Sequence, residues 1–132
     1  MILKYFNNKL VVTLVVLAII FLIDRASKEY VIFLSDQIYD PKLFLSSFLN
    51  IILIWNDGIA FGLLSFKDKT FYHLITGLIS IIIIILLYLI TKSEKLKKYS
   101  YIVIVGGALG NLYDRIVYNS VPDFIDLHYN GF

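Results

Sequence analysis

The sequence contains no cysteine and only two prolines, and few of its residues are charged. Without cysteine the chain cannot form disulfides, thiolate metal sites or covalently attached haem, and it has no thiol nucleophile. Charged residues make up 17% of the 132 residues, whereas soluble domains average about 25%. The net charge of +2 is too small to indicate nucleic-acid binding. The chain therefore has too little charge to cover a soluble globule.

Apolar residues are abundant instead. They form 59% of the chain, and the mean hydropathy is +0.81. This composition excludes disorder and indicates one integral membrane domain. Three stretches predict spanning helices of about 20 residues: helix 1 at about 10–34, helix 2 at about 70–91 and helix 3 at about 99–118. The predicted fold class is all-α transmembrane, with three helices and a small periplasmic β-cradle or hairpin.

Charged residues interrupt two of these stretches. Helix 1 reaches spanning length only if it continues past Asp24, and helix 3 only if it continues past Asp114. A cleaved signal peptide is the alternative for the first stretch, because Lys4 and Lys9 precede its apolar core. No small-x-small cleavage site follows that core, which favours a retained helix.

Lysine placement predicts the orientation. Lysines precede helix 1 and fill the loop at 92–98, so both regions are expected in the cytoplasm. The connection at 36–69 and the segment at 119–132 are then expected outside. Within that connection, the Asn56-Asp57-Gly58 turn signal predicts a hairpin or cradle over 49–64, lying on the membrane surface. A re-entrant helical piece is the alternative, because periodicity does not separate short apolar runs.

Helix 3 carries glycines followed by a polar triad. Gly106 and Gly110 are four residues apart, which permits close helix packing. A phosphate-binding loop fits poorly, since no strand precedes these glycines and no Lys-Ser/Thr follows them. Asn111, Asp114 and Arg115 come next, at spacings that place them on one helical face. An amide, a carboxylate and a guanidinium facing a cavity can orient a peptide backbone.

Two further acidic positions stand out. Asp24 and Lys28 are four apart and can neutralise each other, either as an interfacial pair or in a functional role. Asp123 follows Pro122 among apolar neighbours, so we expect this carboxylate to be desolvated, which favours its protonated form. A metal site is not expected, because the two histidines lie far apart and His73 begins helix 2.

Four blocks resemble the bacterial lipoprotein signal peptidases, the type II signal peptidases. Residues 24–28 read D-R-A-S-K and resemble the D-Q-x-x-K block, with Arg25 where glutamine is usual. Residues 56–61 resemble N-x-G-x-A-F, and residues 121–124 resemble V-x-D-F. Residues 106–115 read G-G-A-L-G-N-L-Y-D-R and closely fit the G-G-A-x-G-N-x-x-D-R block. The order of the blocks also matches.

The resemblance implies an intramembrane aspartic protease of four helices with a periplasmic β-cradle and cytoplasmic termini. It implies a monomeric hydrolase of the bacterial inner membrane that needs no cofactor. Its site would lie near the periplasmic face and cleave prolipoproteins just before a diacylglyceryl-modified cysteine. The implied partners are lipidated signal peptides and membrane lipids, with no nucleic acid.

Residue roles are also implied by the resemblance. Asp123 corresponds to one of two catalytic aspartates. The residues implied to bind substrate or support the site are Asp24, Lys28, Asn56, Gly58, Asn111, Asp114 and Arg115.

The sequence departs from the family pattern at its end. The second catalytic aspartate of the family lies in an N-x-A-D block that begins a fourth helix. This sequence stops at Phe132 without that block, so it is C-terminally incomplete relative to the family. Two neighbouring carboxylates must share a proton in an aspartic protease. We expect Asp114 to be committed to Arg115 or the helix face, and neither Asp114 nor Asp126 to replace the second aspartate.

Three hypotheses follow. The first is a type II signal peptidase, either shortened or a fragment, whose second carboxylate lies outside these residues. The second is an inactive relative that still binds lipoprotein signal peptides. The third treats Asp24, Asp114 and Asp123 as a proton or ion relay, although their placement towards one face is unlike the midplane charges of pumps.

Overall fold

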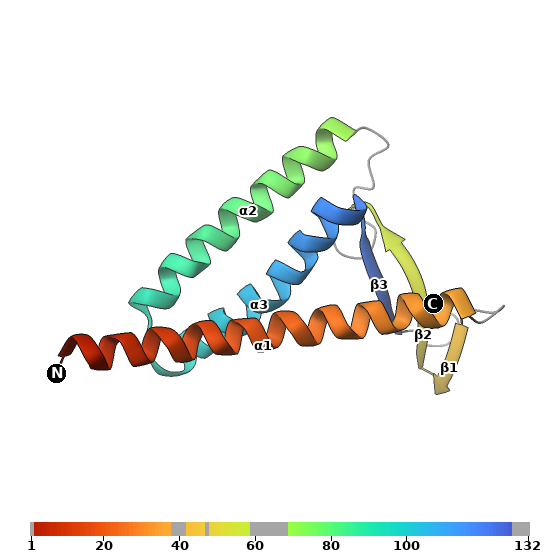
Figure 1. Cartoon of the computed structure of the whole chain (residues 1–132). Helices are drawn as coiled ribbons and strands as arrows, with labels where there is room; N and C mark the ends of the chain where they lie inside the picture. Colours follow the sequence, from red (N-terminus) through yellow and green to blue (C-terminus); the bar gives the residue numbers. More distant parts are fainter. Residues whose placement is uncertain (1, 38–41, 47, 59–68, 128–132) are drawn as a thin grey trace.

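Three helices and a small sheet make up the computed structural model, which describes residues 2–37, 42–46, 48–58 and 69–127 (Figure 1). The helices are α1 (Ile2–Gln37), α2 (Lys69–Lys92) and α3 (Lys95–Tyr118). The strands are β1 (Lys42–Ser46), β2 (Leu49–Asn56) and β3 (Val121–Leu127). Figure 1 shows the sheet near the C-terminal end of α1, while the turn between α2 and α3 lies towards the opposite end.

Two of these helices are long and apolar enough to cross a membrane. They are α1 over Asn8–Gln37 and α2 over Thr70–Lys92. The third, α3, has 24 residues but does not qualify by composition, because its glycines and polar triad lower its hydropathy. Many large apolar side chains of α1 and α2 are exposed, among them Leu22, Ile23 and Ile84. Such a surface is suited to contact with lipid, because the hydrocarbon tails of lipids are as apolar as a leucine side chain.

Helices α1 and α3 extend beyond their predicted ranges. Helix α1 begins and ends outside the predicted range of 10–34. Helix α3 begins at Lys95 rather than near 99, so the predicted loop at 92–98 shortens to Ser93 and Glu94. Hydropathy marks only the apolar part of a helix. Lysine and leucine are good helix formers, so both helices continue past their apolar segments.

The three strands form one antiparallel sheet in the order β1-β2-β3. Strand β2 is the central strand, with Leu49 opposite Leu127 and Asn56 opposite Val121. The first arm of the predicted hairpin is therefore a strand, but its described partners are β1 and β3. The predicted second arm, at 59–64, lies outside the described residues. The outer segment predicted at 119–132 contributes β3, an edge strand that tolerates Pro122.

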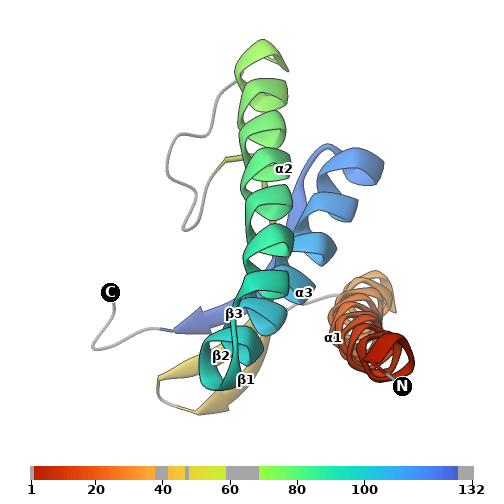
Figure 2. The ribbon, with the colours of Figure 1, turned by 90° about the vertical axis from the view of Figure 1, so that its left-hand side faces the viewer.

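The helices pack around a small apolar core that does not reach the sheet. Leu17, Ile83, Ile90, Ile102 and Val105 are its buried members, contributed by all three helices. In the view along α1, that helix lies beside the lower part of the α2–α3 pair (Figure 2). Only two residues separate β3 from α3, so the packing of α3 also fixes the position where β3 begins.

Candidate active site

A fully buried carboxylate joins α3 to α1. Asp114 has no exposed surface, and its Oδ1 accepts a hydrogen bond from the Arg25 guanidinium. Its other oxygen, Oδ2, accepts from Lys28 Nζ at 2.7 Å. A buried charge must be compensated by charge or hydrogen bonds, and here two cations of α1 do so. The prediction that Asp114 is committed to Arg115 or to the helix face is wrong, because the two partners of its carboxylate, Arg25 and Lys28, belong to α1.

Lys28 gathers the polar groups around this carboxylate. Its ammonium also donates to Asn111 Oδ1 at 2.7 Å and lies 2.9 Å from Asp24 Oδ2. The predicted Asp24–Lys28 pair is therefore confirmed. It is part of a larger cluster and not an isolated interfacial pair. Gly110 makes the approach of α1 feasible, since a Cβ there would collide with the Asp24 carboxylate.

Arg25 extends this cluster towards the C-terminal end of α3. Its guanidinium also contacts Glu29, one turn further along α1. Glu29 Oε1 in turn accepts a hydrogen bond from the Tyr118 hydroxyl at 2.9 Å. Arg25, Glu29 and Tyr118 are not among the predicted site residues. The i, i+4 spacings of Arg25 with Glu29 and of Asp114 with Tyr118 were the available signal.

Arg115 points away from this cluster, towards the end of β2, so the predicted placement of Asn111, Asp114 and Arg115 on one helical face is wrong for Arg115. Its Nη2 donates to the Gly58 carbonyl at 3.2 Å, and its Nη1 donates to the Asn111 carbonyl at 3.3 Å. The side chain is buried, and its Nε makes no hydrogen bond within the described part of the chain. The Arg115 carbonyl accepts from the Tyr72 hydroxyl at 3.3 Å, which ties α2 to the same turn. Arg115 thus fixes the loop after β2 to the end of α3.

Asn56 connects that loop to Asp123. Its Oδ1 accepts from the Gly58 backbone N–H at 2.9 Å, which forms a tight side-chain turn. Its Nδ2 donates to Asp123 Oδ2 at 2.8 Å. Asn56 lies opposite Val121, so Asp123 is its diagonal neighbour on the same face of the sheet. The predicted site residues Asn56, Gly58 and Asp123 therefore lie together.

The expected burial of Asp123 is wrong. The residue is exposed, whereas its neighbour Pro122 is buried. Exposure alternates along β3 from Pro122 onward, and Asp123 shares the exposed side with Ile125 and Leu127. A carboxylate in this position can reach a water molecule and a peptide from outside.

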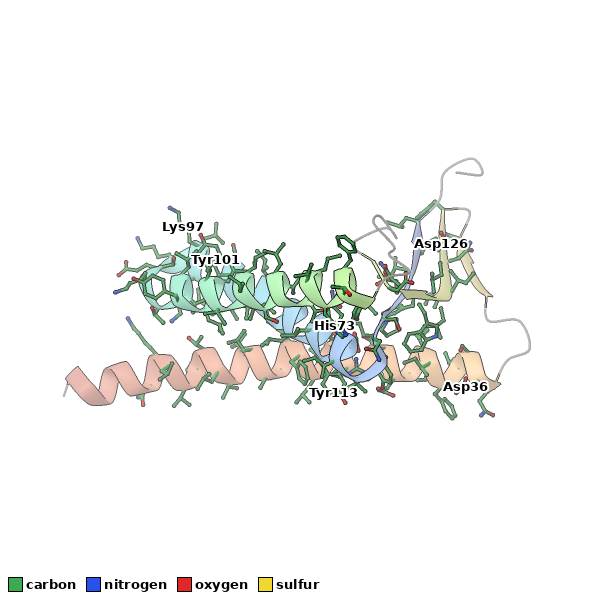
Figure 3. The ribbon with its side chains drawn as sticks, turned by 90° about the horizontal axis from the view of Figure 1, so that it is seen from above. Asp36, His73, Lys97, Tyr101, Tyr113 and Asp126 are labelled. Carbon is green, nitrogen blue, oxygen red and sulfur yellow. The ribbon has the colours of Figure 1, made fainter. Side chains whose placement is uncertain are left out.

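Asp126 has a separate environment. It lies three residues beyond Asp123, so alternation places it on the opposite face of β3. Its Oδ2 accepts from Asn50 Nδ2 at 3.1 Å, and the two residues lie directly opposite in the sheet. A register shift in β2 between Ile51 and Ile54 allows both asparagine–aspartate pairs to form. Figure 3 shows Asp126 at the sheet end of the molecule, far from Lys97.

The predicted site residues thus form two groups on either side of one turn of α3. The first group, between α1 and α3, contains Asp24, Lys28, Asn111 and Asp114. The second, at the ends of β2 and β3, contains Asn56, Gly58, Arg115 and Asp123. The first is a buried ionic cluster. The second offers one exposed carboxylate, Asp123, which accepts a hydrogen bond from Asn56. Within the described ranges, no three histidine or acidic residues gather as a metal site.

Comparisons with known proteins converge on one family. Residues 16–132 match the profile of the family described as signal peptidase (SPase) II. A lipoprotein signal peptidase of Pelagibacter ubique is 45% identical over 119 residues, which cover 90% of this chain and 72% of that protein. A lipoprotein signal peptidase of Rickettsia felis is 35% identical over 131 residues, which cover 96% of this chain and 61% of that protein.

Solved structures agree with these relatives. A bacterial membrane enzyme solved by the in meso method at 2.3 Å resolution aligns with a TM-score of 0.68 at 32% identity. The alignment covers 92% of this chain and 73% of that one. A second such structure, at 1.9 Å resolution, aligns with a TM-score of 0.65 at 32% identity, and 77% of its chain is covered.

Proposed function

This chain belongs to the signal peptidase II family, and from that premise we propose that it is a membrane endopeptidase of the aspartic type. Its substrates are prolipoproteins that carry a diacylglyceryl-modified cysteine, and it removes their signal peptides. Asp123 is one of the two catalytic carboxylates. The relatives' names support the processing of lipoproteins, whereas the aspartic chemistry rests on the residues themselves.

One observation carries this proposal: Asp123 is exposed, yet Asn56 Nδ2 holds it at 2.8 Å. The carboxylate is therefore open to substrate and fixed in direction, which a reacting group requires. Asn56 is itself fixed through the Gly58 N–H, and Arg115 fixes the Gly58 carbonyl. The site also lies just past the end of α3, where a peptide leaving the bilayer could meet it.

In the proposed reaction, ionised Asp123 removes a proton from water as that water attacks the scissile carbonyl, and Asp123 then gives the proton to the leaving amine as the C–N bond breaks. A second, neutral carboxylate donates a hydrogen bond to the carbonyl oxygen. In the resembled family this second aspartate belongs to an N-x-A-D block, which the 132 residues do not contain. Neither described candidate suits this role. Asp114 is bound by two cations, and Asp126 points to the opposite face, towards Asn50.

The buried ionic cluster has a supporting role in this proposal. Lys28 and Asp114 hold α1 against the turn of α3 that also carries Arg115. Arg115 then holds the loop after β2, which we assign to the cradle that clamps the substrate. Asn111 accepts a further hydrogen bond from Lys28, and Asp24 forms an ion pair with it. The cluster therefore fixes the position of the site.

We assign the site to the periplasmic face of the bacterial inner membrane. The N-terminal lysines and the lysines near the α2–α3 turn then lie in the cytoplasm, as the positive-inside rule requires. In the structure this turn and the sheet lie towards opposite ends, which is compatible with that orientation (Figure 1). We propose that the protein works as a monomer.

The test is Asp123→Asn in the protein as its gene encodes it, assayed with a lipidated prolipoprotein in membranes or micelles. We expect cleavage to be lost while membrane insertion and folding persist, because the amide keeps the shape of the carboxylate but cannot act as a base. Asp126→Asn is the matched control, since it changes an aspartate of the same strand on the other face. Cleavage that survives Asp123→Asn would remove Asp123 from the chemistry. Equal loss in both variants would indicate a defect of the strand instead.

A further inference from the structure

Tyr118 joins three elements at the outer end of α3. It is the last residue of that helix, and its hydroxyl donates to Glu29 of α1 at 2.9 Å. The Trp55 ring of β2 meets the Tyr118 ring edge-on, with centroids 5.5 Å apart and planes at 62°. One side chain therefore links α1, α3 and the sheet.

Arg25 supports this junction from the buried side. Its guanidinium is shared between Glu29 and Asp114, and only 8% of the residue is exposed. It also lies over the Tyr113 ring at 4.7 Å and the Tyr118 ring at 5.9 Å. Such cation–π contacts strengthen as they are desolvated. Arg25 occupies the position where the resembled block usually has glutamine, so this cationic support is a feature of this chain.

The junction lies at the base of the strand that carries Asp123. Asn119 follows Tyr118 in the left-handed conformation, with φ 56°, and this turns the chain out of α3. Trp55 lies opposite Pro122, directly before Asp123. Any movement of Tyr118 is thus transmitted through a short, sharply turned connection to the proposed catalytic carboxylate.

We propose that Glu29 and Tyr118 are positioning residues that set the direction in which β3 leaves α3, and so the place of Asp123. The inference rests on the proposed function, because it assigns Asp123 to catalysis. Glu29 and Tyr118 do not touch the substrate in this account. They act through the Tyr118 ring on Trp55 and through the turn at Asn119.

The first measurement is the steady-state cleavage of a lipidated prolipoprotein by Tyr118→Phe, Glu29→Ala and the double variant. Tyr118→Phe removes only the hydroxyl and keeps the contact with Trp55. A displacement of a catalytic group by about 1 Å can lower the rate roughly 100-fold. The loss of one hydrogen bond should displace Asp123 by less than this, so we expect kcat to fall about tenfold. KM should change less than about twofold, since the substrate contacts remain. The double variant should be no slower than Glu29→Ala, because Glu29→Ala already removes the hydrogen bond that Tyr118→Phe breaks.

Two variants calibrate this result. Glu29→Gln should restore most of the rate, because its amide oxygen still accepts from Tyr118. Tyr30→Phe should leave the rate unchanged, since Tyr30 is 63% exposed and its hydroxyl has no hydrogen bond with the described residues. Unchanged kcat in Tyr118→Phe or Glu29→Ala would overturn the proposal. So would additive losses in the double variant, or a Glu29→Gln protein as slow as Glu29→Ala.

The second measurement does not depend on activity. The chain has no cysteine, so cysteines placed at Leu22 and Ile125, both more than 60% exposed, can carry two spin labels without background. The label–label distance should be narrowly distributed in the parent protein and broader with Tyr118→Phe. An unchanged distribution would overturn the positioning role. If the parent protein cleaves no prolipoprotein, the proposed function fails, and this distance alone decides the inference.

Discussion

Lys28→Met tests whether the buried ionic cluster holds α1 to α3. Lys28 is 5% exposed, and its ammonium contacts Asn111 and Asp114 at 2.7 Å and Asp24 at 2.9 Å. Methionine keeps the length of the apolar stem but removes the charge. In this variant Arg25 is the one cation that still contacts Asp114 among the described residues. Asp24 loses its ion pair with Lys28.

The expected loss of stability is large. Removing one partner of a buried ion pair costs about 3–5 kcal/mol, because the other charge stays buried without compensation. Arg25 still contacts Asp114, so we expect the lower end of this range, about 3 kcal/mol. The free energy of unfolding would be measured by denaturant titration in detergent micelles, followed by circular dichroism.

Two further variants interpret the result. Lys97→Met removes an exposed lysine of α3 and should change the unfolding free energy by less than about 0.5 kcal/mol. The double variant Lys28→Met with Asp114→Leu should cost less than the sum of its parts, since an apolar pair needs no compensation. A loss below about 1 kcal/mol for Lys28→Met, or strict additivity, would refute the view that these charges stabilise the interface.

The remaining predictions concern α3. Gly110→Ala should destabilise the protein by about 1–3 kcal/mol in the same titration, because its methyl group would collide with the Asp24 carboxylate. Gly107→Ala should be neutral or stabilise by up to about 1 kcal/mol, since nothing lies within 4 Å of its added Cβ. Arg115→Lys should slow prolipoprotein cleavage about tenfold, because one ammonium does not reproduce the fork between the Gly58 and Asn111 carbonyls. Wild-type cleavage by Arg115→Lys would contradict the proposed role of that fork.

Local patterns predicted part of the helical site, although not the direction of Arg115. The Asp24–Lys28 pair and the close packing at Gly106 and Gly110 depend on spacing along one helix, and spacing is visible in the sequence. Against Gly106, an added Cβ would meet the Ile20 side chain at 2.5 Å, as close packing requires. The resemblance similarly named residues that lie together at the sheet, such as Asn56 and Asp123.

Contacts between distant segments were not predictable in the same way. Strand β2 pairs with β3 about 70 residues later, and nothing in the apolar run at 49–56 indicates that partner. The exposure of Asp123 depends on that pairing, because the sheet decides which side of β3 is open. The apolar residues next to Asp123 in the sequence therefore led to a wrong prediction of the environment of this carboxylate. Arg25 was likewise noted only as a departure from glutamine, since its bond to Asp114 joins residues 89 apart.

The two groups of polar residues are connected through one turn of α3, which carries Asp114 of the first group and Arg115 of the second. Asp114 and Arg115 point about 100° apart, so one faces the cations of α1 while the other reaches the Gly58 carbonyl. A rotation of α3 that improved one contact would break the other. The Lys28–Asp114 contact also requires α1 to approach α3 closely, and Gly110 permits this approach one turn before Asp114. The glycine therefore contributes to the site as much as the charged residues do, because the Lys28–Asp114 contact needs the space that its missing side chain leaves.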